Sequence, residues 1–445
     1  MKRRDFLSNS TKVASSLALS NILPSRIFGK TSTIAPSDKI RVGFIGVKGM
    51  GSSIMNSMFK LPEVDVVAFC DVDDTVLSNR QKDLDKAKGT KAQTYKDFRK
   101  LLENKDIDAV AIATPDHWHA LPMIYACQAG KDVYVEKPVG RSIEECTAML
   151  KAARKYERVV QVGQWQRSHK HWQDATDFVK SGKLGNIRLV KTWAYQGWMN
   201  TIPIKPDSPV PKGVDYDMWL GPATKRPFNE NRFHFNFRWF WDYAGGLMTD
   251  WGVHIIDMGL MGMNAQGPKS VMASGGKFFG KPTAMETPDT LQAIYEFDNY
   301  TMIWEHGNGI NLGPYGRDHG VAFIGNNGTL VVDRNGWEVL PEPNRLDWSK
   351  TEGNKMEGQA LIKAEGSGLD FHTRNFIDCM KSRQKPNCDI AIAHNTALNS
   401  SLGNIAFRTN SKIFWDAAKQ EIIGNKEAQK LTKANYQNGW SLPKL

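Results

Sequence analysis

The sequence predicts an α/β protein that begins, after a short leader, with a parallel sheet covered by helices on both faces. Two observations support this prediction. With 445 residues, the chain is too long for one ordinary hydrophobic core, which indicates two or three domains. From Lys39 onward, short apolar strands alternate with helical stretches, and this alternation is typical of a parallel sheet with helices packed against it.

The strands of this sheet are short apolar runs followed by glycine or polar residues. In chain order they are IRVGFIG, VDVVAFC, DAVAIAT and DVYVEKP. Helical stretches lie between them, for example Leu121 to Ala129 and Ile143 to Tyr156. We therefore expect a first domain over residues 39–165 and a second over residues 166–445.

Residues 1–30 are not expected to belong to the fold. Arg3 and Arg4 are followed by Phe6 and Leu7, and a mildly apolar stretch runs from Val13 to Leu23. This segment resembles a twin-arginine export signal, which carries folded proteins across the inner membrane. The alternative is a disordered basic tail. We expect export to the periplasm, with the cleavage site left open.

Composition places the chain among ordinary globular proteins, with 41% hydrophobic and 24% charged residues. The net charge is +11, but residues 1–30 hold six basic side chains and one acid, so the remainder carries +6. The other basic residues are scattered among acids with no basic stripe, which argues against nucleic acid as a partner. No run of about eighteen apolar residues occurs, so we expect no permanent membrane span.

The first turn of the predicted sheet is rich in glycine. It reads GFIGVKGMG, and the following helix is expected to begin near Met50. Glycines at this point let the backbone approach a pyrophosphate, which then lies at the helix N-terminus. The turn departs from G-x-G-x-x-G because Lys48 holds the middle position, and Gly49 beside it is expected to allow the close approach instead.

A carboxylate follows the second strand at the spacing expected for ribose recognition. Asp71 comes twenty residues after Gly51, and Asp73 follows it. No arginine lies immediately beside them to bind a 2'-phosphate, so NAD is favoured over NADP. The alternative for Asp71 is a helix-capping role.

Polar residues also end the next two strands. Pro115, in TPDHWHA, breaks the fourth strand at the carboxyl edge of the sheet, where ligands of such folds bind. Lys137, in EKP, ends a buried strand, and a buried ammonium is costly unless it reaches a partner. Pro138 restricts the backbone there and thereby fixes where the ammonium points.

No metal site is predicted. His117 and His119 have a His-x-His spacing that can chelate a metal ion, but the sequence places no third ligand nearby. A histidine at the start of a helix can instead serve as a helix cap. The cysteines are odd in number and have no metal-ligand spacing, so we expect them to be small buried apolar residues. They are Cys70, Cys127, Cys146, Cys379 and Cys388.

The stretch GGLMTDWGVHIID, from Gly245 to Asp257, predicts a helix that is apolar almost all round and therefore buried. Asp250, His254 and Asp257 then share one face. Polar groups on a buried face cost several kcal/mol without partners, so this stripe is a candidate site.

In this order and spacing, these motifs resemble the Gfo/Idh/MocA oxidoreductases, which act on sugars and cyclic polyols. The matching segments are IGVKGMG, CDVD, ATPDHWHA, AGKDVYVEKP, GG-x-x-x-D-x-G-x-H-x-x-D and the closing FIDCMKSRQKPNCDIAIAHNTALNSSLGNIAFRTNSKIFWD. The resemblance spans nearly everything after Lys39. EKP combined with D-x-x-x-H after GG is specific, whereas the glycine turn is not.

The resemblance implies an N-terminal Rossmann domain and a C-terminal α/β domain with a large, mainly antiparallel sheet. Runs such as IRLVKTWAYQ, TLQAIYEF, TMIWEHG and VAFIGNNGTLVV fit that sheet. In the family the sheet usually forms the oligomer interface, so a homodimer or homotetramer is expected. The closing helical segment is expected to pack back near the first domain.

The resemblance also assigns the site. Lys137, Asp250 and His254 match the family's catalytic trio. In the oxidation of a secondary alcohol, His254 would take the hydroxyl proton, Lys137 would polarise the same oxygen, and Asp250 would orient the substrate or the histidine. The alternative is an internal ion pair of Lys137 with Asp250 that only holds the domains together.

Further residues are expected to contact the cofactor or the substrate. Substrate contacts are expected from Arg167 and Trp251, and for Asp257 a purely structural role is as well supported as a substrate contact. The residues expected to bind the cofactor are Gly46, Lys48, Gly49, Met50, Gly51, Asp71, Thr114, Pro115, His119 and Glu136.

Export sharpens the functional hypothesis, because no obvious pool of soluble NAD exists outside the cytoplasm. We therefore expect an oxidoreductase acting on a secondary hydroxyl of a sugar, glycoside or cyclic polyol, with NAD tightly bound. The alternative is a redox-neutral glycosidase, lyase or epimerase in which the hydride returns to the sugar. A third hypothesis, a binding protein without chemistry, is disfavoured by the intact trio.

Overall fold

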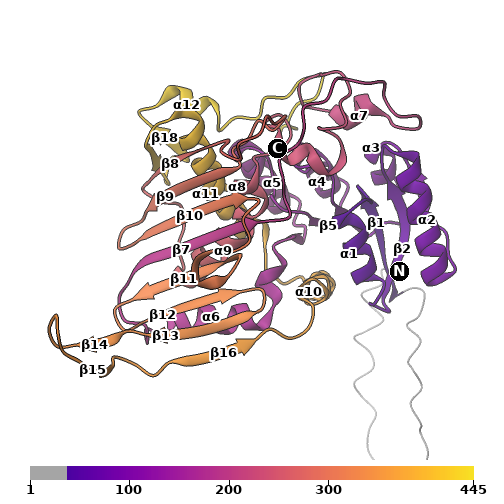
Figure 1. Ribbon diagram of the computed structural model, residues 1–445. Helices are drawn as coiled ribbons and strands as arrows, with labels where there is room; N and C mark the ends of the chain where they lie inside the picture. The colour runs from indigo at the N-terminus through magenta and orange to yellow at the C-terminus, as the bar shows by residue number, and fades with distance from the viewer. Residues whose placement is uncertain (1–37) are drawn as a thin grey trace, which may run out of the picture. The chain divides into compact units, whose positions relative to one another are not determined.

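The computed structural model describes residues 38–445 (Figure 1), and the predicted signal segment at residues 1–30 lies outside the described residues. Lys39 to Leu445 form one unit that contains two large sheets. The predicted fold class is confirmed: a parallel sheet of the Rossmann type precedes a region built on a large, mostly antiparallel sheet.

The first sheet has six parallel strands in the order β3-β2-β1-β4-β5-β6. Its strands are β1 (Ile40–Ile45), β2 (Val64–Cys70), β3 (Gln93–Tyr95), β4 (Ala109–Ile112), β5 (Asp132–Val135) and β6 (Val160–Val162). The central strands β4 and β5 are buried throughout, because helices cover both faces of a parallel sheet. The strand order changes direction at β1, and a ligand crevice is expected at such a point.

The helices of this half begin where their caps predict. Asp73 accepts a hydrogen bond from the Thr75 N–H at the start of α2, and Ser142 forms a capping box with Glu145 at the start of α5. The helices are α1 (Met50–Met58), α2 (Asp74–Lys88), α3 (Phe98–Leu102), α4 (Ala120–Gln128) and α5 (Ile143–Lys155). The predicted helices at 121–129 and 143–156 are therefore confirmed to within a residue.

The second sheet has ten strands, and all its pairs are antiparallel except β10 with β7. In sheet order the strands are β16 (Gln359–Lys363), β13 (Gly336–Pro341), β12 (Gly328–Asp333), β11 (His319–Gly325), β7 (Ile187–Gln196), β10 (Thr301–Asn308), β9 (Thr290–Glu296), β8 (Ser270–Gly276), β17 (Ile413–Asp416) and β18 (Glu421–Ile423). Beyond it, β14 (Pro343–Arg345) and β15 (Thr351–Asn354) form a two-stranded ribbon.

Helices cover one face of this sheet. They are α6 (Lys170–Lys180), α9 (Gly252–Met263), α11 (Ile390–Thr409) and the short α12 (Lys426–Lys430) (Figure 1). Between them and the sheet lies the largest core cluster, with Trp172, Tyr295, Trp304 and Phe323 fully buried. No helix within residues 38–445 combines the length and apolar character needed to cross a membrane.

The last third of the chain returns to the first sheet. Helix α10 (Gly368–Ser382) packs against α1, and α11 packs against α5. Near the C-terminus, Trp440 packs edge-on against Trp118 and stacks on Phe98. The hydrophobic cores around the first sheet therefore include residues of the closing segment, such as Phe376 and Ile390.

The helix predicted for Gly245 to Asp257 is interrupted. It consists of α8 (Leu247–Asp250) and α9, and Trp251 forms the junction between them. This is a correction to the prediction of one continuous helix. The short helix α7 (Tyr216–Leu220) belongs to an aromatic cluster that also includes Trp239 and Tyr243.

Candidate active site

A cavity of about 760 Å³ lies at the carboxyl ends of β1, β2, β4 and β5 and is closed by residues of the second half of the chain. This volume is in the usual range for ligand pockets. Lys137, Asp250 and His254 all line it, together with Trp251. The predicted cofactor residues that line it are Gly46, Lys48, Gly49, Met50, Asp71, Thr114, Pro115 and Glu136.

The turn between β1 and α1 is built for close backbone approach. Gly46 has φ +79°, and a Cβ there would lie 2.7 Å from backbone atoms of Ala113 and Thr114. A Cβ on Gly51 would collide with the carbonyl oxygen of Gly46. Gly51 does not line the cavity. Its lack of a side chain instead lets α1 pack closely onto the turn.

Asp71, at the end of β2, stabilises this turn through hydrogen bonds to its backbone. Its carboxylate accepts hydrogen bonds from the backbone N–H groups of Val47, at 3.0 Å, and Asp73, at 3.1 Å. Burial raises the pKa of Asp71 to about 6 despite these bonds. Asp73, rather than Asp71, caps α2, so the capping alternative considered for Asp71 does not describe it.

Two of the predicted cofactor residues each have a buried polar atom with no hydrogen-bond partner within residues 38–445. These atoms are Thr114 Oγ1 and Glu136 Oε1. The other carboxylate oxygen of Glu136 accepts the N–H of Lys137, and burial raises the pKa of Glu136 to about 7. Unsatisfied buried groups of this kind suit a polar ligand, and with the glycine turn they fit a dinucleotide.

The two predicted histidines of TPDHWHA do not face the cavity. His119 Nδ1 lies 2.6 Å from the carbonyl of Pro138 and its Nε2 lies 2.8 Å from that of Thr114. His119 does not line the cavity, so its cofactor contact stays a prediction, and its side chain does not cap α4, which corrects the expectation of a capping role. His117 Nε2 contacts the Trp219 carbonyl at 3.0 Å. Across residues 38–445, no group of three or more potential ligands is placed to hold a metal ion.

Lys137 joins the two halves of the chain at the cavity. Its Nζ lies 2.6 Å from Asp250 Oδ1 and donates to that oxygen, and Arg238 Nε lies 3.2 Å from Oδ2. Burial alone would raise the pKa of Asp250, but the two cations outweigh it and lower the pKa to about 2. Asp250 thus orients Lys137 rather than His254, to which it makes no hydrogen bond within the described residues.

His254 projects from the first turn of α9 into the same cavity. Its ring lies between those of Trp165 and Trp251, with centroid distances of 6.1 and 6.2 Å, and its Nδ1 is buried without a hydrogen-bond partner. Burial lowers the pKa of His254 well below 6.5, and the charges of Lys137 and Arg334 lower it further. The imidazole is therefore neutral at pH 7, the form that can accept a proton.

Three functional side chains of the cavity were not predicted from the sequence: Asp116, Arg238 and Arg334. Asp116 is buried beside Lys137 and Asp250, and burial raises its pKa to about 8, so its carboxyl is protonated at neutral pH. The sequence signal for Asp116 was its position directly after Pro115, at the end of the strand. Arg238 lies in an aromatic-rich stretch that offered no periodic pattern, and Arg334 lies in a hairpin turn.

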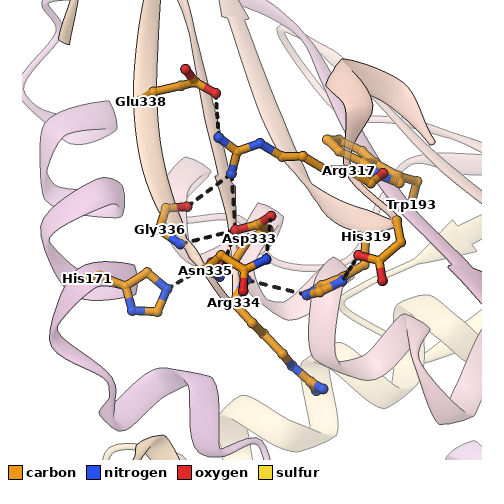
Figure 2. A network of polar contacts seen from close by, with 10 residues as sticks. His171, Trp193, Arg317, His319, Asp333, Arg334, Asn335, Gly336 and Glu338 are labelled. Atoms are coloured by element: carbon orange, nitrogen blue, oxygen red, sulfur yellow. Dashed lines mark hydrogen bonds and ion pairs between the residues drawn. The ribbon is translucent and has the colours of Figure 1, made fainter. Parts of the chain in front are cut away.

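A polar network fixes the hairpin that carries Arg334. Figure 2 shows Arg317 extending to Glu338, to the Gly336 carbonyl and to Asp333, while the Arg334 side chain extends away from this group. The Asp333 carboxylate also accepts the backbone N–H groups of Asn335 and Gly336, at 2.7 and 3.1 Å. The backbone from which Arg334 enters the cavity is therefore tightly held.

Arg167 and Asp257 are paired with each other instead of facing a ligand. Arg167 Nε and Nη2 donate to the two oxygens of Asp257 at 2.7 and 2.9 Å, and Thr396 Oγ1 donates to Oδ1 at 2.7 Å. Neither residue lines the cavity, and the Asp257 side chain is fully buried. The substrate contact expected of Arg167 therefore stays a prediction, and the full burial of Asp257 suits the structural role left open for it.

A parallel sheet with a glycine turn, whose carboxyl edge carries Lys137 and meets Asp250 and His254 from the second half of the chain, is typical of two-domain oxidoreductases of the dinucleotide-binding class. Comparison with protein families agrees. Residues 40–164 match the model of the oxidoreductase family with an NAD-binding Rossmann fold, and residues 190–335 match that family's C-terminal α/β domain. The chain belongs to the Gfo/Idh/MocA family of oxidoreductases.

Curated relatives are similar over parts of their length. An uncharacterized oxidoreductase of Rhizobium meliloti, ORF334, is 28% identical over 42% of this chain and 55% of its own. An uncharacterized oxidoreductase of Bacillus subtilis, YrbE, is 25% identical over 66% of this chain and 74% of its own. An alpha-N-acetylgalactosaminidase of Shewanella oneidensis is 33% identical over 35% of this chain and 38% of its own.

Solved structures share the fold over most of the chain. Levoglucosan dehydrogenase in complex with NADH and levoglucosan has a TM-score of 0.63 at 19% identity, covering 84% of this chain and 99% of that one. Aldose-aldose oxidoreductase from Caulobacter crescentus has a TM-score of 0.64 at 17% identity, with coverage of 84% and 99%.

Proposed function

We propose that this protein oxidises a secondary hydroxyl of a sugar, glycoside or cyclic polyol and holds NAD tightly. The observation that carries the proposal is the convergence of Lys137, Asp250 and His254 on one cavity at the carboxyl edge of the first sheet. The sugar dehydrogenases among the structural relatives support the substrate class by analogy of fold.

The residues present fit the proposed chemistry. NAD, when bound, supplies an acceptor for the hydride that leaves the alcohol carbon. Lys137, held by Asp250, donates a hydrogen bond to the substrate hydroxyl oxygen, and the neutral His254 takes the hydroxyl proton. The carbon loses a hydride and the oxygen loses a proton, which leaves a ketone.

NAD is preferred over NADP in this proposal because a cation that lines the cavity near the end of β2 is already engaged. Lys96 lines the cavity, but its Nζ lies 2.9 Å from Asp74 and donates to the Gly213 carbonyl at 2.8 Å. Asp71 at the end of β2 would repel a 2'-phosphate whenever it is ionised.

A redox-neutral reaction is the second candidate, and one finding favours it specifically. The 33% identity to an alpha-N-acetylgalactosaminidase, and similar values for several glycosyl hydrolase family 109 proteins, link the chain to enzymes that cleave glycosides. In such a cycle, the oxidised sugar would undergo elimination or epimerisation and then recover its hydride.

One experiment separates these reactions. The purified protein is mixed with a panel of sugars and aryl glycosides while the absorbance of reduced nicotinamide is followed. Lasting, stoichiometric reduction of added NAD supports net oxidation, and transient reduction of a bound nicotinamide without added acceptor supports the redox-neutral cycle. No spectral response to any sugar contradicts both and favours a binding protein.

We also propose that the protein is exported by the twin-arginine route to the periplasm, on the basis of Arg3 and Arg4 ahead of an apolar stretch. Fractionation of cells that produce the wild type or the Arg3→Lys/Arg4→Lys variant tests this. The wild type is expected in the periplasmic fraction and the variant in the cytoplasm.

We further propose that the second sheet mediates assembly of two or four copies. Its face opposite the covering helices presents exposed apolar side chains on neighbouring strands: Leu189, Met272, Ile294, Phe414 and Ile423. Light scattering of the wild type and of Ile294→Lys tests the proposal. A monomeric wild type would contradict it.

A further inference from the structure

Arg334 is a charged side chain inside the cavity that forms no ion pair within the described residues. Its guanidinium lies over the rings of Trp165 and Trp251, with its Cζ 4.5 and 4.3 Å from their centroids. Within residues 38–445, the guanidinium makes no ion pair, and its Nε is buried without a hydrogen-bond partner. The backbone N–H of Arg334 donates to His319 Nε2 at 3.4 Å, which helps to fix the hairpin but leaves the guanidinium free (Figure 2).

The neighbouring cations of the cavity are already paired. Lys137 and Arg238 share Asp250, and Lys96 pairs with Asp74. Lys48 belongs to the glycine turn, where a pyrophosphate is expected. Arg334 is therefore the cation on the His254 side of the cavity that remains available to a ligand.

The space next to Arg334 has a basic character. A second cavity adjoins the first at Trp165, Arg334 and Leu369, and its lining includes His169 and Lys363 but no aspartate or glutamate. A negatively charged group that enters from this side meets no like charge in that lining.

A buried guanidinium without a counter-ion is costly, and packing against tryptophan rings offsets only part of that cost. Burial lowers the pKa of Arg334 to about 10, although Asp250 and Asp318 act against this effect, so the group stays charged at neutral pH. The guanidinium lies over both rings, and its Nε has no hydrogen-bond partner within residues 38–445, so it is available to donate to a ligand. An edge-on guanidinium matches the planar, bidentate geometry of a carboxylate.

We propose that Arg334 binds a carboxylate carried by the substrate, so that the protein acts on acidic sugars of the uronate type in preference to their neutral counterparts. This inference rests on the proposed function, because it places a substrate substituent in the cavity that Lys137 and His254 line. A sulfate or phosphate ester would offer the same charge with tetrahedral geometry.

The test is binding calorimetry on the NAD-loaded protein with matched sugars. The pairs are methyl glucuronide with methyl glucoside and methyl galacturonide with methyl galactoside, with glucose 6-sulfate and glucose 6-phosphate as tetrahedral anions. In at least one pair, the acid is expected to bind about 10- to 100-fold more tightly than the neutral sugar. Arg334→Gln is expected to reduce this ratio to about threefold or less.

Arg345→Gln is the matched control, since Arg345 is exposed in the adjoining β14–β15 ribbon and is expected to leave the ratio unchanged. The proposal is overturned if neutral sugars bind as tightly as acids in both pairs, if the preference survives Arg334→Gln, or if the tetrahedral anions bind best. It is also overturned if Arg334→Gln weakens NAD binding by the same factor, because Arg334 would then hold the cofactor. Failure of the proposed oxidation would show as absent nicotinamide reduction with the binding preference intact.

Discussion

One cavity is lined by three carboxyl groups: Asp250, Asp116 and Glu136. Burial and nearby cations set the charge of each. Asp250 has two cations against it, and its pKa falls to about 2. Burial raises the pKa of Asp116 to about 8 and that of Glu136 to about 7. At neutral pH Asp250 is therefore a fixed anion that holds Lys137, whereas Asp116 is a hydrogen-bond donor.

At this scale, the sequence predicted the site residues that belong to recognisable motifs. It missed those that only the tertiary structure brings to the cavity. Lys137, Asp250 and His254 follow from EKP and D-x-x-x-H, and all three line the cavity. Arg334 reaches the cavity from the hairpin between β12 and β13, which is far from those motifs in the sequence. Arg167 was expected at the substrate because it lies at the junction of the domains, but no local pattern reveals that Asp257 neutralises it.

The charge state of His254 gives the first prediction. Because burial and two nearby cations lower its pKa, its imidazole is expected to stay neutral as the pH falls from 7 through 6.5. Nitrogen chemical shifts of labelled histidine measure this, with the His254→Ala variant identifying the signal. A titration midpoint at or above 6.5 would contradict the proposed electrostatics.

The second prediction concerns the pair of Arg167 with Asp257. Arg167→Met leaves a buried carboxylate without its cation and is expected to lower the free energy of unfolding by about 3–5 kcal/mol. Adding Asp257→Asn to the same chain should restore much of this loss. Chemical denaturation measures both, and a fully stable Arg167→Met variant that binds sugar poorly would instead restore a substrate role.

At the scale of elements, the alternation of strands and helices predicted β1, β2, β4 and β5 of the first sheet, because these runs are largely apolar and β4 and β5 are buried throughout. The three-residue strands β3 and β6 were not predicted, since β3 is mostly exposed and polar and both are too short to show a pattern. The break between α8 and α9 was not predicted. The apolar pattern continues through Trp251, and the interruption depends on contacts made elsewhere, including the packing of Trp251 against His319 and Arg334.

The glycine turn before α1 gives the third prediction. Gly51→Ala places a Cβ against the Gly46 carbonyl, so the turn must shift and NAD is expected to bind at least about tenfold more weakly. Gly89→Ala is the control, because Gly89 has open space around it, and its positive φ strains an alanine there without any collision. That variant should lose about 1 kcal/mol of stability and keep its NAD affinity, as measured by calorimetry. Equal NAD affinity in both variants would argue against a cofactor role for the turn.

At the scale of the whole molecule, the end of the chain stabilises its beginning. Glu63, just before β2, lies 2.5 Å from Arg374 and 2.8 Å from Lys381 of α10. Such pairings were not predictable, since they join positions about three hundred residues apart in sequence. The closing helices thereby tie the first sheet to the second half of the chain, and Leu369 of α10 also lines the cavity.

Glu63 gives the fourth prediction. The hydrogen bond from Arg374, with a further contribution from Lys381, lowers the pKa of Glu63 from 4.5 to about 2. Because both cations are partly exposed, Glu63→Gln is expected to cost about 1–2 kcal/mol at pH 7.

This contribution is present above pH 4.5 and is lost as the pH falls from 4.5 toward 2. The difference in unfolding free energy between the wild type and Glu63→Gln should therefore shrink over that interval. Glu103→Gln, in an exposed pair with Lys100, serves as the control and should change stability by less than about 0.5 kcal/mol. A difference that grows on acidification would contradict the assignment.

The central claim is that Lys137 and His254 act together on a substrate beside the bound dinucleotide. The most direct measurement is the single-turnover rate of nicotinamide reduction by a reactive sugar in the wild type, Lys137→Met and His254→Ala, with the NAD affinity of each measured separately. Each substitution is expected to slow reduction by at least about 100-fold and to change NAD affinity by no more than a few-fold. Reduction within a few-fold of the wild-type rate in either variant would contradict the account.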